Sequence, residues 1–368
     1  MNKLILSLIC LCLLSLNAQA NVAYDNVEIQ LVTISPGEYY WSAFGHSAIR
    51  IKSPTYDKMF GFGYFNFEDE DFFINFAQGN MQYFLGVVDS KYELEGYKKE
   101  GRKTTIQRLL LTSIQKKQLV EKLVFLSKPE NRYYHYDYFL NNCTSKIRDI
   151  LDEVTNGEVS SQLKPIETDS SWNDKTFPVS NQAWVNLGIA YAYGVPAYAI
   201  KNKWQLSVFP EDLAEDLKQL KTESKWNSDY EIYYQPSPSE LETKQQSFIK
   251  THYAVILVIG FLLVGLLFEK SFKATRIFWL LVQNLMGIGL FMLWFFTQHG
   301  VAYWNINLLI FSPFAIMLIF NTSFKPLLNK IFLASNLLWI ILALIYTNLY
   351  LIGFCLINLL IWKNHKQA

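Results

Sequence analysis

The sequence predicts an α+β exported domain, a small helical appendage and then an α-helical membrane bundle. Three observations lead to this prediction. A short apolar segment opens the chain and ends in Ala-Gln-Ala, strand-like and helix-like runs of soluble composition continue to about Lys250, and long apolar runs begin after Thr251. Apolar runs of that length are typical of membrane spans. The 368 residues are enough for one or two domains with cores of their own.

The first 20 residues, "MNKLILSLICLCLLSLNAQA", predict a secretory signal peptide. They combine Lys3, an apolar stretch and a small-x-small ending, so we expect cleavage after Ala20. Cys10 and Cys12 would leave with the peptide. Neither lies at the cleavage point, so the chain is not predicted to be a lipoprotein itself. The alternative is an uncleaved signal anchor.

Three strands are predicted in the first part of the exported domain. They are "VEIQLVTIS", "FGHSAIRIK" and "MFGFGYFNF", separated by the turn-rich "PGEYYW" and "SPTYD". In the second strand Ile49 and Ile51 alternate with His46 and Ala48. Because successive side chains of a strand point to opposite faces, one face is apolar and the other presents His46.

Two helices with apolar stripes are predicted next. The segment "TSIQKKQLVEKLVFLSK" places leucines near helical spacing, and the segment that follows Cys143 does the same with Ile147, Ile150, Leu151 and Val154. The aromatic residues 133–139 between them are strand-like or irregular. We therefore expect one α+β domain over residues 21–165.

The helical appendage is predicted over residues 166–230. Residues 165–180 are polar and loop-like, whereas "NQAWVNLGIAYAYG" and "PEDLAEDLKQLKTE" indicate helices. The second has Pro210 in its first turn and acidic residues early, which suits the helix dipole. A linker rich in proline and serine, residues 231–250, follows.

Residues 251–368 are predicted to form a membrane domain of about five helices, with four as the alternative. Three apolar runs are "HYAVILVIGFLLVGLLF", "IFWLLVQNLMGIGLFMLWFF" and "NINLLIFSPFAIMLIF". A fourth tract, residues 331–362, is too long for one span and is broken by the polar "YTNLY". Five spans place every cation of this part on one side: Lys270, Lys273, Arg276, Lys325, Lys330, Lys363 and Lys366. The positive-inside rule then predicts a multi-pass protein of the inner (cytoplasmic) membrane with its N-terminal domain on the periplasmic side.

Charge and motifs exclude several function classes. Residues 21–250 hold 25 Lys plus Arg and 31 Asp plus Glu, a net charge of −6, which argues against nucleic acid binding. There is no dinucleotide or P-loop glycine pattern, so no cofactor is predicted. One exported cysteine and two histidines do not give a closed zinc ligand set, so no metal is predicted. The acidic run 68–71 is interpreted as a solvated turn.

Cys143, in "YFLNNCTSKIRDIL", is the strongest candidate for chemistry. After signal removal it is the only cysteine outside the predicted membrane domain, so it has no partner for an internal disulfide. Asn141 or Asn142 is a good N-cap, which places Cys143 in the first turn of a helix. There the free N–H groups and the helix dipole lower a thiol pKa and can bind an oxyanion. The alternative is a buried cysteine that acts as a small hydrophobe.

A cysteine nucleophile needs a base, and the predicted exported domain contains only His46 and His135. We prefer His46, which follows a glycine at the start of a strand. His135 lies among four tyrosines, where aromatic packing or a surface position is expected. For His46 the alternative is a core histidine bonded to the backbone.

Several blocks resemble the Lnb N-terminal periplasmic domain family. They are "WSAFGHSAIRIK", "FGFGYFNF…FFINFAQGNMQYFLG", "YHYDYFLNNCTSKIRDIL" and "WVNLGIAYAYG…FPEDL", and they span most of residues 25–220. The resemblance implies a permuted papain-like thiol-enzyme fold, similar to NlpC-type and lecithin:retinol acyltransferase-like (LRAT-like) proteins, with catalytic roles for His46 and Cys143. Where related members usually have Asn-Tyr-Gly, this chain has Gly61, Phe62 and Gly63. A third residue that orients the histidine is therefore not identified.

The resemblance also implies an activity, lipoprotein N-acyl transfer. A phospholipid would donate an acyl chain to Cys143, and the α-amine of the diacylglyceryl-cysteine at a lipoprotein N-terminus would accept it. Backbone N–H groups around Cys143, with Asn142 and Asn141 in support, would stabilise the oxyanion. The enzymatic alternative is a membrane-anchored cysteine peptidase or amidase that acts on cell-wall peptide. The non-enzymatic alternative is an envelope assembly module with an inert cysteine.

Overall fold

The computed structural model describes residues 24–179, 183–220, 230–237, 248–320, 323–346 and 349–365. The predicted signal peptide and half of the predicted linker, residues 238–247, lie outside these ranges. By its contacts the chain divides into two compact units. Unit 1 comprises Met1–Phe72, Met81–Thr168 and Lys201–Leu241, and unit 2 comprises Phe73–Asn80, Asp169–Ile200 and Glu242–Ala368. The predicted appendage contributes to both units, and its bounds as a domain stay a prediction.

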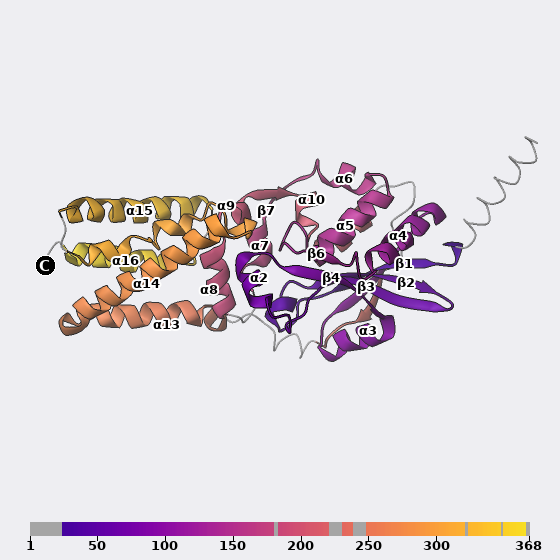
Figure 1. The fold of residues 1–368 in the computed structure, drawn as a ribbon, viewed down its shortest axis with the longest axis horizontal. Helices are drawn as coiled ribbons and strands as arrows, with labels where there is room; N and C mark the ends of the chain where they lie inside the picture. Colours follow the sequence, from indigo (N-terminus) through magenta and orange to yellow (C-terminus); the bar gives the residue numbers. More distant parts are fainter. Residues whose placement is uncertain are drawn as a thin grey trace, which may run out of the picture. The chain divides into compact units, whose positions relative to one another are not determined.

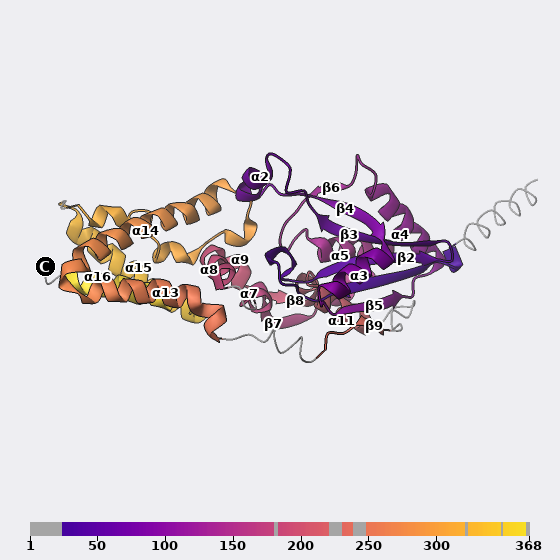
Figure 2. The same cartoon turned by 90° about the horizontal axis from the view of Figure 1, so that it is seen from below.

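Unit 1 is built on a seven-stranded antiparallel sheet (Figures 1 and 2). The strand order is β6-β4-β3-β2-β1-β5-β9. The bounds are β1 Glu28–Ile34, β2 His46–Ser53, β3 Tyr56–Tyr64, β4 Gln82–Asp89, β5 Thr104–Leu109, β6 Tyr133–His135 and β9 Tyr230–Tyr234. The first three confirm the strands predicted from their β-branched and aromatic runs.

Helices cover both faces of this sheet. The core on one face contains Ile49 and Ile51 of β2, as predicted, and continues into Leu119, Leu123 and Ile147 of the covering helices. The helices of unit 1 on or near this face are α4 Ser113–Leu126, α5 Cys143–Val154, α6 Glu158–Leu163, α10 Lys203–Leu206 and α11 Pro210–Gln219. On the other face Ala48, Met59 and Leu94 belong to a second, smaller core beneath α3 Ser90–Lys99. The α+β prediction is therefore confirmed for unit 1.

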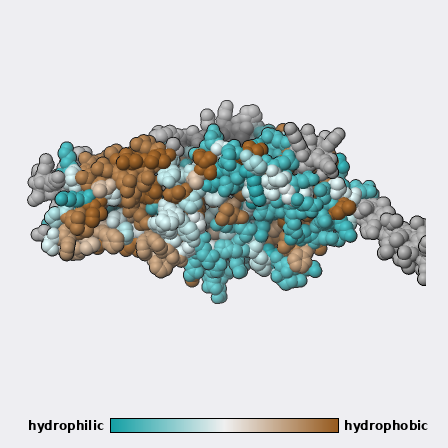
Figure 3. Space-filling model, turned by 90° about the horizontal axis from the view of Figure 1, so that it is seen from above, coloured by the Kyte–Doolittle hydropathy of each residue, from teal (hydrophilic) through white to brown (hydrophobic). Residues whose placement is uncertain are grey.

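Unit 2 is largely helical, and hydrophobic residues gather over its long helices in Figure 3. The helices of this unit are α2 Phe72–Gln78 (all but its first residue), α7 Trp172–Thr176, α8 Ala183–Ala192, α9 Val195–Tyr198, α13 Phe248–Leu267, α14 Glu269–Phe296, α15 Lys325–Ile345 and α16 Ile352–His365. Two segments are long and apolar enough to cross a membrane, Phe272–Phe296 and Lys325–Ile345, and two shorter apolar helices are His252–Leu266 and Ile352–Lys363. The break predicted at "YTNLY" lies between α15 and α16. The number of spans stays a prediction.

The third predicted span, residues 305–320, is not a continuous helix. It contains two short 3₁₀ helices, η3 Ile306–Leu309 and η4 Ala315–Leu318. Side-chain amides from other helices bond to backbone carbonyls of this segment, which a continuous helix would use internally. Asn358 Nδ2 donates to the carbonyl of Ile310 at 2.9 Å, and Asn284 Nδ2 donates to the carbonyl of Pro313. Irregular backbone at membrane depth is tolerated only with such partners.

The predicted polar loop at residues 165–180 is partly wrong. Its residues form β7 Glu167–Ser171, which pairs with β8 Ile200–Asn202 in a separate two-stranded sheet, and then α7. The Ser171 hydroxyl accepts from the N–H of Asp174, and the Asp174 carboxylate accepts from the N–H of Ser171. This capping box starts a helix within a polar stretch.

Within unit 2, segments predicted to be exported contact residues of the two loops without Lys or Arg, which are residues 297–305 and 346–350. The N–H of Gly194 donates to the carbonyl of Val301 at 2.9 Å, and the N–H of Gln298 donates to the carbonyl of Gln78 at 2.8 Å. Near the second loop the rings of Phe177 and Tyr350 lie 4.9 Å apart. Val301, Gln298 and Tyr350 are therefore on the same side of unit 2 as these segments, whose export stays a prediction.

Candidate active site

Cys143 is the first residue of α5, and Asn142 is its N-cap. Asn142 Oδ1 accepts from the N–H of Thr144 at 3.0 Å and of Ser145 at 2.8 Å. The Ser145 hydroxyl in turn accepts from the N–H of Asn142 at 2.8 Å, which completes a capping box. This reciprocal cap satisfies N–H groups that a helix start leaves without partners. Cys143 consequently lies in the first turn, as the sequence predicted.

The amide nitrogen of the Asn142 side chain also makes hydrogen bonds. Its Nδ2 donates to the carbonyls of Tyr138 at 2.9 Å and Val208 at 3.0 Å, and the residue is buried. Asn141 Nδ2 donates to the carbonyl of His135. Both asparagines thus shape the chain just ahead of Cys143. Their predicted support of an oxyanion stays a prediction.

The half-buried Cys143 thiol has a lowered pKa. Burial raises the pKa, but the positive charge of His46 and a hydrogen bond with its ring act in the opposite direction. The N–H of Ser47 and the hydroxyl of Thr144 lower the pKa further, and the result is about 7 against an ordinary 9.0. Half of the thiol is therefore ionised near neutral pH, which is typical of a nucleophilic cysteine.

His46 is the first residue of β2, and its side chain reaches the thiol because the start of β2 lies beside the start of α5. Thr144 links the two elements: its Oγ1 lies 3.7 Å from Cys143 Sγ and donates to Ser47 Oγ at 3.1 Å. Gly45, with φ +79°, makes the turn into β2, and a Cβ there would lie 2.7 Å from the carbonyl oxygen of Ile34. Only glycine suits this left-handed and crowded position.

Two glycines of β3 leave room for both reacting groups. A Cβ on Gly61 would lie 3.2 Å from His46 Nε2, and a Cβ on Gly63 would lie 3.6 Å from Cys143 Cβ. Gly63 has φ +100°, and the register between β3 and β4 shifts between Gly61 and Tyr64. Gly61 takes the place of the asparagine in the Asn-Tyr-Gly pattern, whereas Gly63 matches the glycine of that pattern.

The other exported histidine occupies a different place. His135 is the last residue of the edge strand β6, is exposed, and pairs in register with Gln82. Its backbone carbonyl accepts the Asn141 amide. The structure thus gives His46, and not His135, a described role in lowering the thiol pKa.

Sequence reasoning missed the tyrosines beside the thiol. Burial raises the pKa of Tyr134 and of Tyr136, and the charge of Cys143 contributes to both. The two phenols therefore stay neutral where the thiol ionises. The sequence favours aromatic packing for the stretch "RYYHYDYF", and its distance of only a few residues from Cys143 is the signal that could have found them.

Exposed aromatic residues just ahead of His46 in the chain form a patch together with Phe67. Its members are between 36% and 57% exposed: Tyr39, Tyr40, Trp41, Phe44 and Phe67. The rings of Tyr39 and Trp41 stack at 4.6 Å, and Trp41 meets the edge of Phe67 at 5.7 Å. Exposed rings that pack on one another form a surface suited to apolar or interfacial ligands.

Two hollows lie elsewhere in unit 1. One, of about 590 Å³, follows α3 and is lined by Glu93 and Tyr97 among others, and the second, of about 340 Å³, lies between β1, β5 and α11. Neither is lined by Cys143 or His46. In the part of the chain that the structure describes, no group of three or more His, Cys, Asp or Glu residues is arranged to hold a metal ion.

The comparison with protein families gives one match. The family model of the Lnb N-terminal periplasmic domain covers residues 15–175. The matched part contains His46, Asn141, Asn142 and Cys143. No curated protein and no solved structure matches the chain.

Proposed function

Residues 15–175 belong to the Lnb N-terminal periplasmic domain family, and on this premise we propose that the protein is a thiol-dependent lipoprotein N-acyltransferase. We also propose that unit 1 has the permuted papain-like arrangement. In support, a helix that starts with the cysteine packs on an antiparallel sheet, and an earlier strand of that sheet starts with the histidine.

The observation that carries the proposal is the Cys143–His46 pair at the start of α5. A thiol with a pKa of about 7 and a histidine bonded to it form a nucleophile and its base. In the first step the Cys143 thiolate attacks the ester carbonyl of a phospholipid. The C–S bond forms, the ester C–O bond breaks, and His46 gives its proton to the leaving oxygen of the lysophospholipid.

The second step transfers the acyl group to nitrogen. The α-amine of a diacylglyceryl-cysteine attacks the thioester carbonyl, the C–N bond forms and the C–S bond breaks. His46 takes a proton from the attacking amine, and the Cys143 thiolate is restored. The products are an amide and a triacylated lipoprotein.

Each tetrahedral intermediate needs hydrogen-bond donors for its oxyanion. Asn142 Oδ1 accepts from the N–H groups of Thr144 and Ser145, so we assign the backbone N–H of Cys143 itself as the first donor. It belongs to the same first turn as the thiol, where the helix dipole also favours negative charge.

The aromatic patch supports a lipid substrate rather than a cell-wall peptide. Trp and Tyr are enriched where proteins meet the membrane–water interface, and the patch exposes Tyr39, Tyr40 and Trp41 close to His46 in sequence. Two apolar helices long enough to cross a membrane follow in the same chain. A phospholipid donor and a lipoprotein acceptor are both found at such an interface.

The proposed location is the inner membrane, with unit 1 in the periplasm. The loops 297–305 and 346–350 contain no Lys or Arg, and their residues Gln298, Val301 and Tyr350 contact segments that are predicted to be exported. The cationic loops would then face the cytoplasm, in agreement with the positive-inside rule.

The test compares lipoprotein N-termini from cells that express either the wild-type chain or Cys143→Ala at equal level. Mass spectra of the N-terminal lipopeptides should show an added acyl chain only with the wild type. Identical spectra would overturn the proposed function.

A further inference from the structure

We propose that Tyr64 and Glu93 are positioning residues for His46 and that together they replace an orienting side chain at position 61. The inference rests on the proposed function for the role of His46 as a base. It is carried by the close packing around Gly61 and by the hydrogen bonds that hold Glu93.

The first observation is that the Tyr64 ring occupies the space above two glycines. A Cβ on Gly86 would lie 2.7 Å from two ring carbons of Tyr64, and a Cβ on Gly61 would lie 3.0 Å from one of the same two carbons. The first contact is shorter than real Cβ atoms show and the second is unusually tight, so the ring fits here because both positions lack a Cβ. The same Cβ on Gly61 would lie 3.2 Å from His46 Nε2. The phenol ring and the imidazole therefore share the space that a side chain at position 61 would fill.

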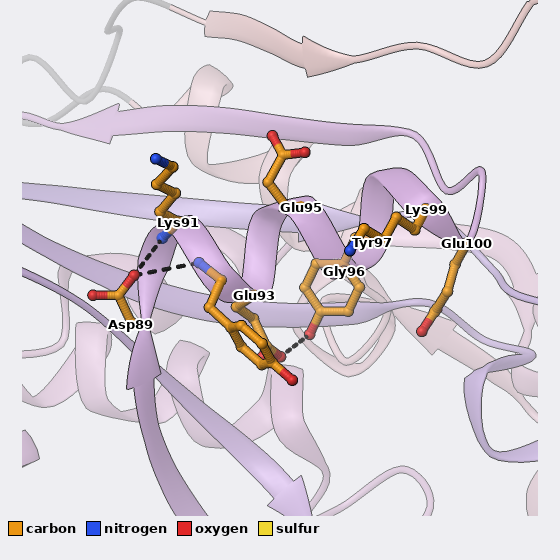
Figure 4. A pocket seen from close by; sticks show the side chains of 9 residues that line it. Asp89, Lys91, Glu93, Glu95, Gly96, Tyr97, Lys99 and Glu100 are labelled. Atoms are coloured by element: carbon orange, nitrogen blue, oxygen red, sulfur yellow. Dashed lines mark hydrogen bonds between the residues drawn. The ribbon is translucent and has the colours of Figure 1, made fainter.

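The second observation is that Glu93 fixes this ring. The Tyr64 hydroxyl donates to Glu93 Oε1 at 2.9 Å, and the Tyr97 hydroxyl donates to the same oxygen at 2.6 Å. Figure 4 shows the Glu93 and Tyr97 side chains pointing toward one another from α3. The Tyr97 ring in turn lies 6.5 Å from the His46 ring, tilted by 48°. Two tyrosines thus connect one carboxylate to the surroundings of the histidine.

The charges around this group are consistent with a positioning role. Burial raises the pKa of Tyr64 and of Tyr97, and the nearby carboxylate of Glu93 raises both further. Both phenols therefore remain neutral donors. Arg102, whose guanidinium lies 5.1 Å from the centre of the Tyr97 ring, is a second charged group beside these rings. Its side chain donates to Glu100 and to the carbonyl of Ser35.

The mechanism uses the carboxylate when the imidazole is charged. The charge of His46 and a hydrogen bond with its ring stabilise the Cys143 thiolate. A carboxylate held beside the imidazole by Tyr64 and Tyr97 would favour that charge. The Tyr64 ring, held by Glu93, restricts the imidazole to the orientation that faces the thiol. Loss of the Glu93 carboxylate should therefore make the Cys143 thiolate less stable in the lipid-free protein, and its alkylation should begin at a higher pH.

The experiment measures alkylation of Cys143 by iodoacetamide between pH 5 and pH 10 in the full chain in detergent, with the modified peptide identified by mass spectrometry. Glu93→Gln, which keeps the shape and can still accept one hydroxyl, should move the midpoint up by about one pH unit. Tyr64→Phe, which keeps the ring but loses the bond to Glu93, should move it in the same direction by less. The matched control is Glu95→Gln on the same helix, whose carboxylate accepts from Tyr233, and it should leave the midpoint unchanged.

The proposal is overturned when Glu93→Gln and Glu95→Gln give the same midpoint while thermal unfolding shows both to be folded. If Glu93→Gln does not fold, the proposal is overturned when Tyr64→Phe gives the same alkylation midpoint as the wild type. Alkylation needs no lipid or lipoprotein. A midpoint shift in Glu93→Gln together with an absence of acyl transfer by the wild type would support the positioning role and reject the proposed function.

Discussion

Cys143 and Cys355 both lie in helices, but the surroundings of their sulfur atoms differ. Cys143 opens α5, is half-buried, and has His46 and the N–H of Ser47 beside its sulfur. Cys355 is the fourth residue of α16, is fully buried, and its sulfur donates to the carbonyl of Asn336 at 3.5 Å. Its own N–H donates to the carbonyl of Leu351, at 3.4 Å.

The comparison shows that the surroundings of a cysteine, and not its presence in a helix, separate a reactive thiol from a structural one. At the first residue of α5 the helix offers free N–H groups and a positive dipole end, and the neighbouring strand brings His46. At the fourth residue of α16 the N–H already bonds within the helix and the surroundings are apolar, here Trp339, Leu351 and Phe354. Substitutions of the two cysteines and of their neighbours test this difference.

Cys143→Ser should have the strongest effect. The hydroxyl has nearly the same shape but does not ionise near neutral pH, so acyl transfer to a lipoprotein should fall by about a thousandfold or more. The rate is measured with purified full chain and phospholipid in mixed micelles. Cys355→Ala is the matched control and should keep the wild-type rate. Equal losses in both variants would contradict the contrast.

His46→Ala should rank second, with an effect on the thiol itself. Without the positive charge and hydrogen bond of His46, burial is left to raise the Cys143 pKa from about 7 to its ordinary 9.0 or above. The thiolate fraction at pH 7, and with it the alkylation rate, should fall by about fiftyfold. At pH 10 most of the difference should disappear. An alkylation profile that does not move would show that His46 does not act on the thiol.

Much of this contrast is predictable from the sequence. Two asparagines ahead of a cysteine and an apolar stripe indicate a capped helix, and the structure confirms that helix with Asn142 as the cap. The sequence permits a pairing of Cys143 with His46 but does not establish it, because the pairing depends on the packing of β2 against α5, where Thr144 bonds to Ser47, 97 residues away in the chain. Glu93 lies 29 residues from Tyr64, and no local pattern predicts that contact.

The expectation of a continuous helix in the third predicted span was wrong for a different reason. Residues 305–320 are apolar enough for a membrane helix, but composition does not reveal where the backbone hydrogen bonds go. Asn305 and Asn307 bond to the carbonyls at the end of α8, which are more than a hundred residues away in the chain. These long-range amide bonds favour short 3₁₀ turns over one continuous helix.

Asn142→Ala tests the cap, with a moderate effect on stability. The variant loses the acceptor for two N–H groups and leaves the carbonyls of Tyr138 and Val208 without their donor. We expect a loss of about 2 kcal/mol in the free energy of unfolding. Asn202→Ala, which removes the exposed N-cap of α10, should cost about 1 kcal/mol.

Thermal unfolding of both variants in detergent measures the two losses, and the pH profile of Cys143 alkylation separates their consequences. The profile should move to higher pH in Asn142→Ala and stay in place in Asn202→Ala. Equal profiles would mean that the cap matters for stability alone.

The weakest effect is expected for the structural cysteine. Cys355→Ala removes one buried sulfur from a packed helix, which should lower the stability of the folded chain by about 1 kcal/mol. Iodoacetamide labelling of Cys143 should be identical to the wild type. A change in that labelling would show that the two thiols are coupled.

A search for the acyl-enzyme decides whether Cys143 is the nucleophile. The full chain is incubated with phospholipid in the absence of lipoprotein and digested, and the mass of the peptide with Cys143 is measured. We expect a peptide heavier by one fatty acyl group, which neutral hydroxylamine removes and which His46→Ala greatly reduces. A Cys143 peptide that carries no acyl group, from a preparation that still N-acylates lipoprotein, would rule out the thioester route.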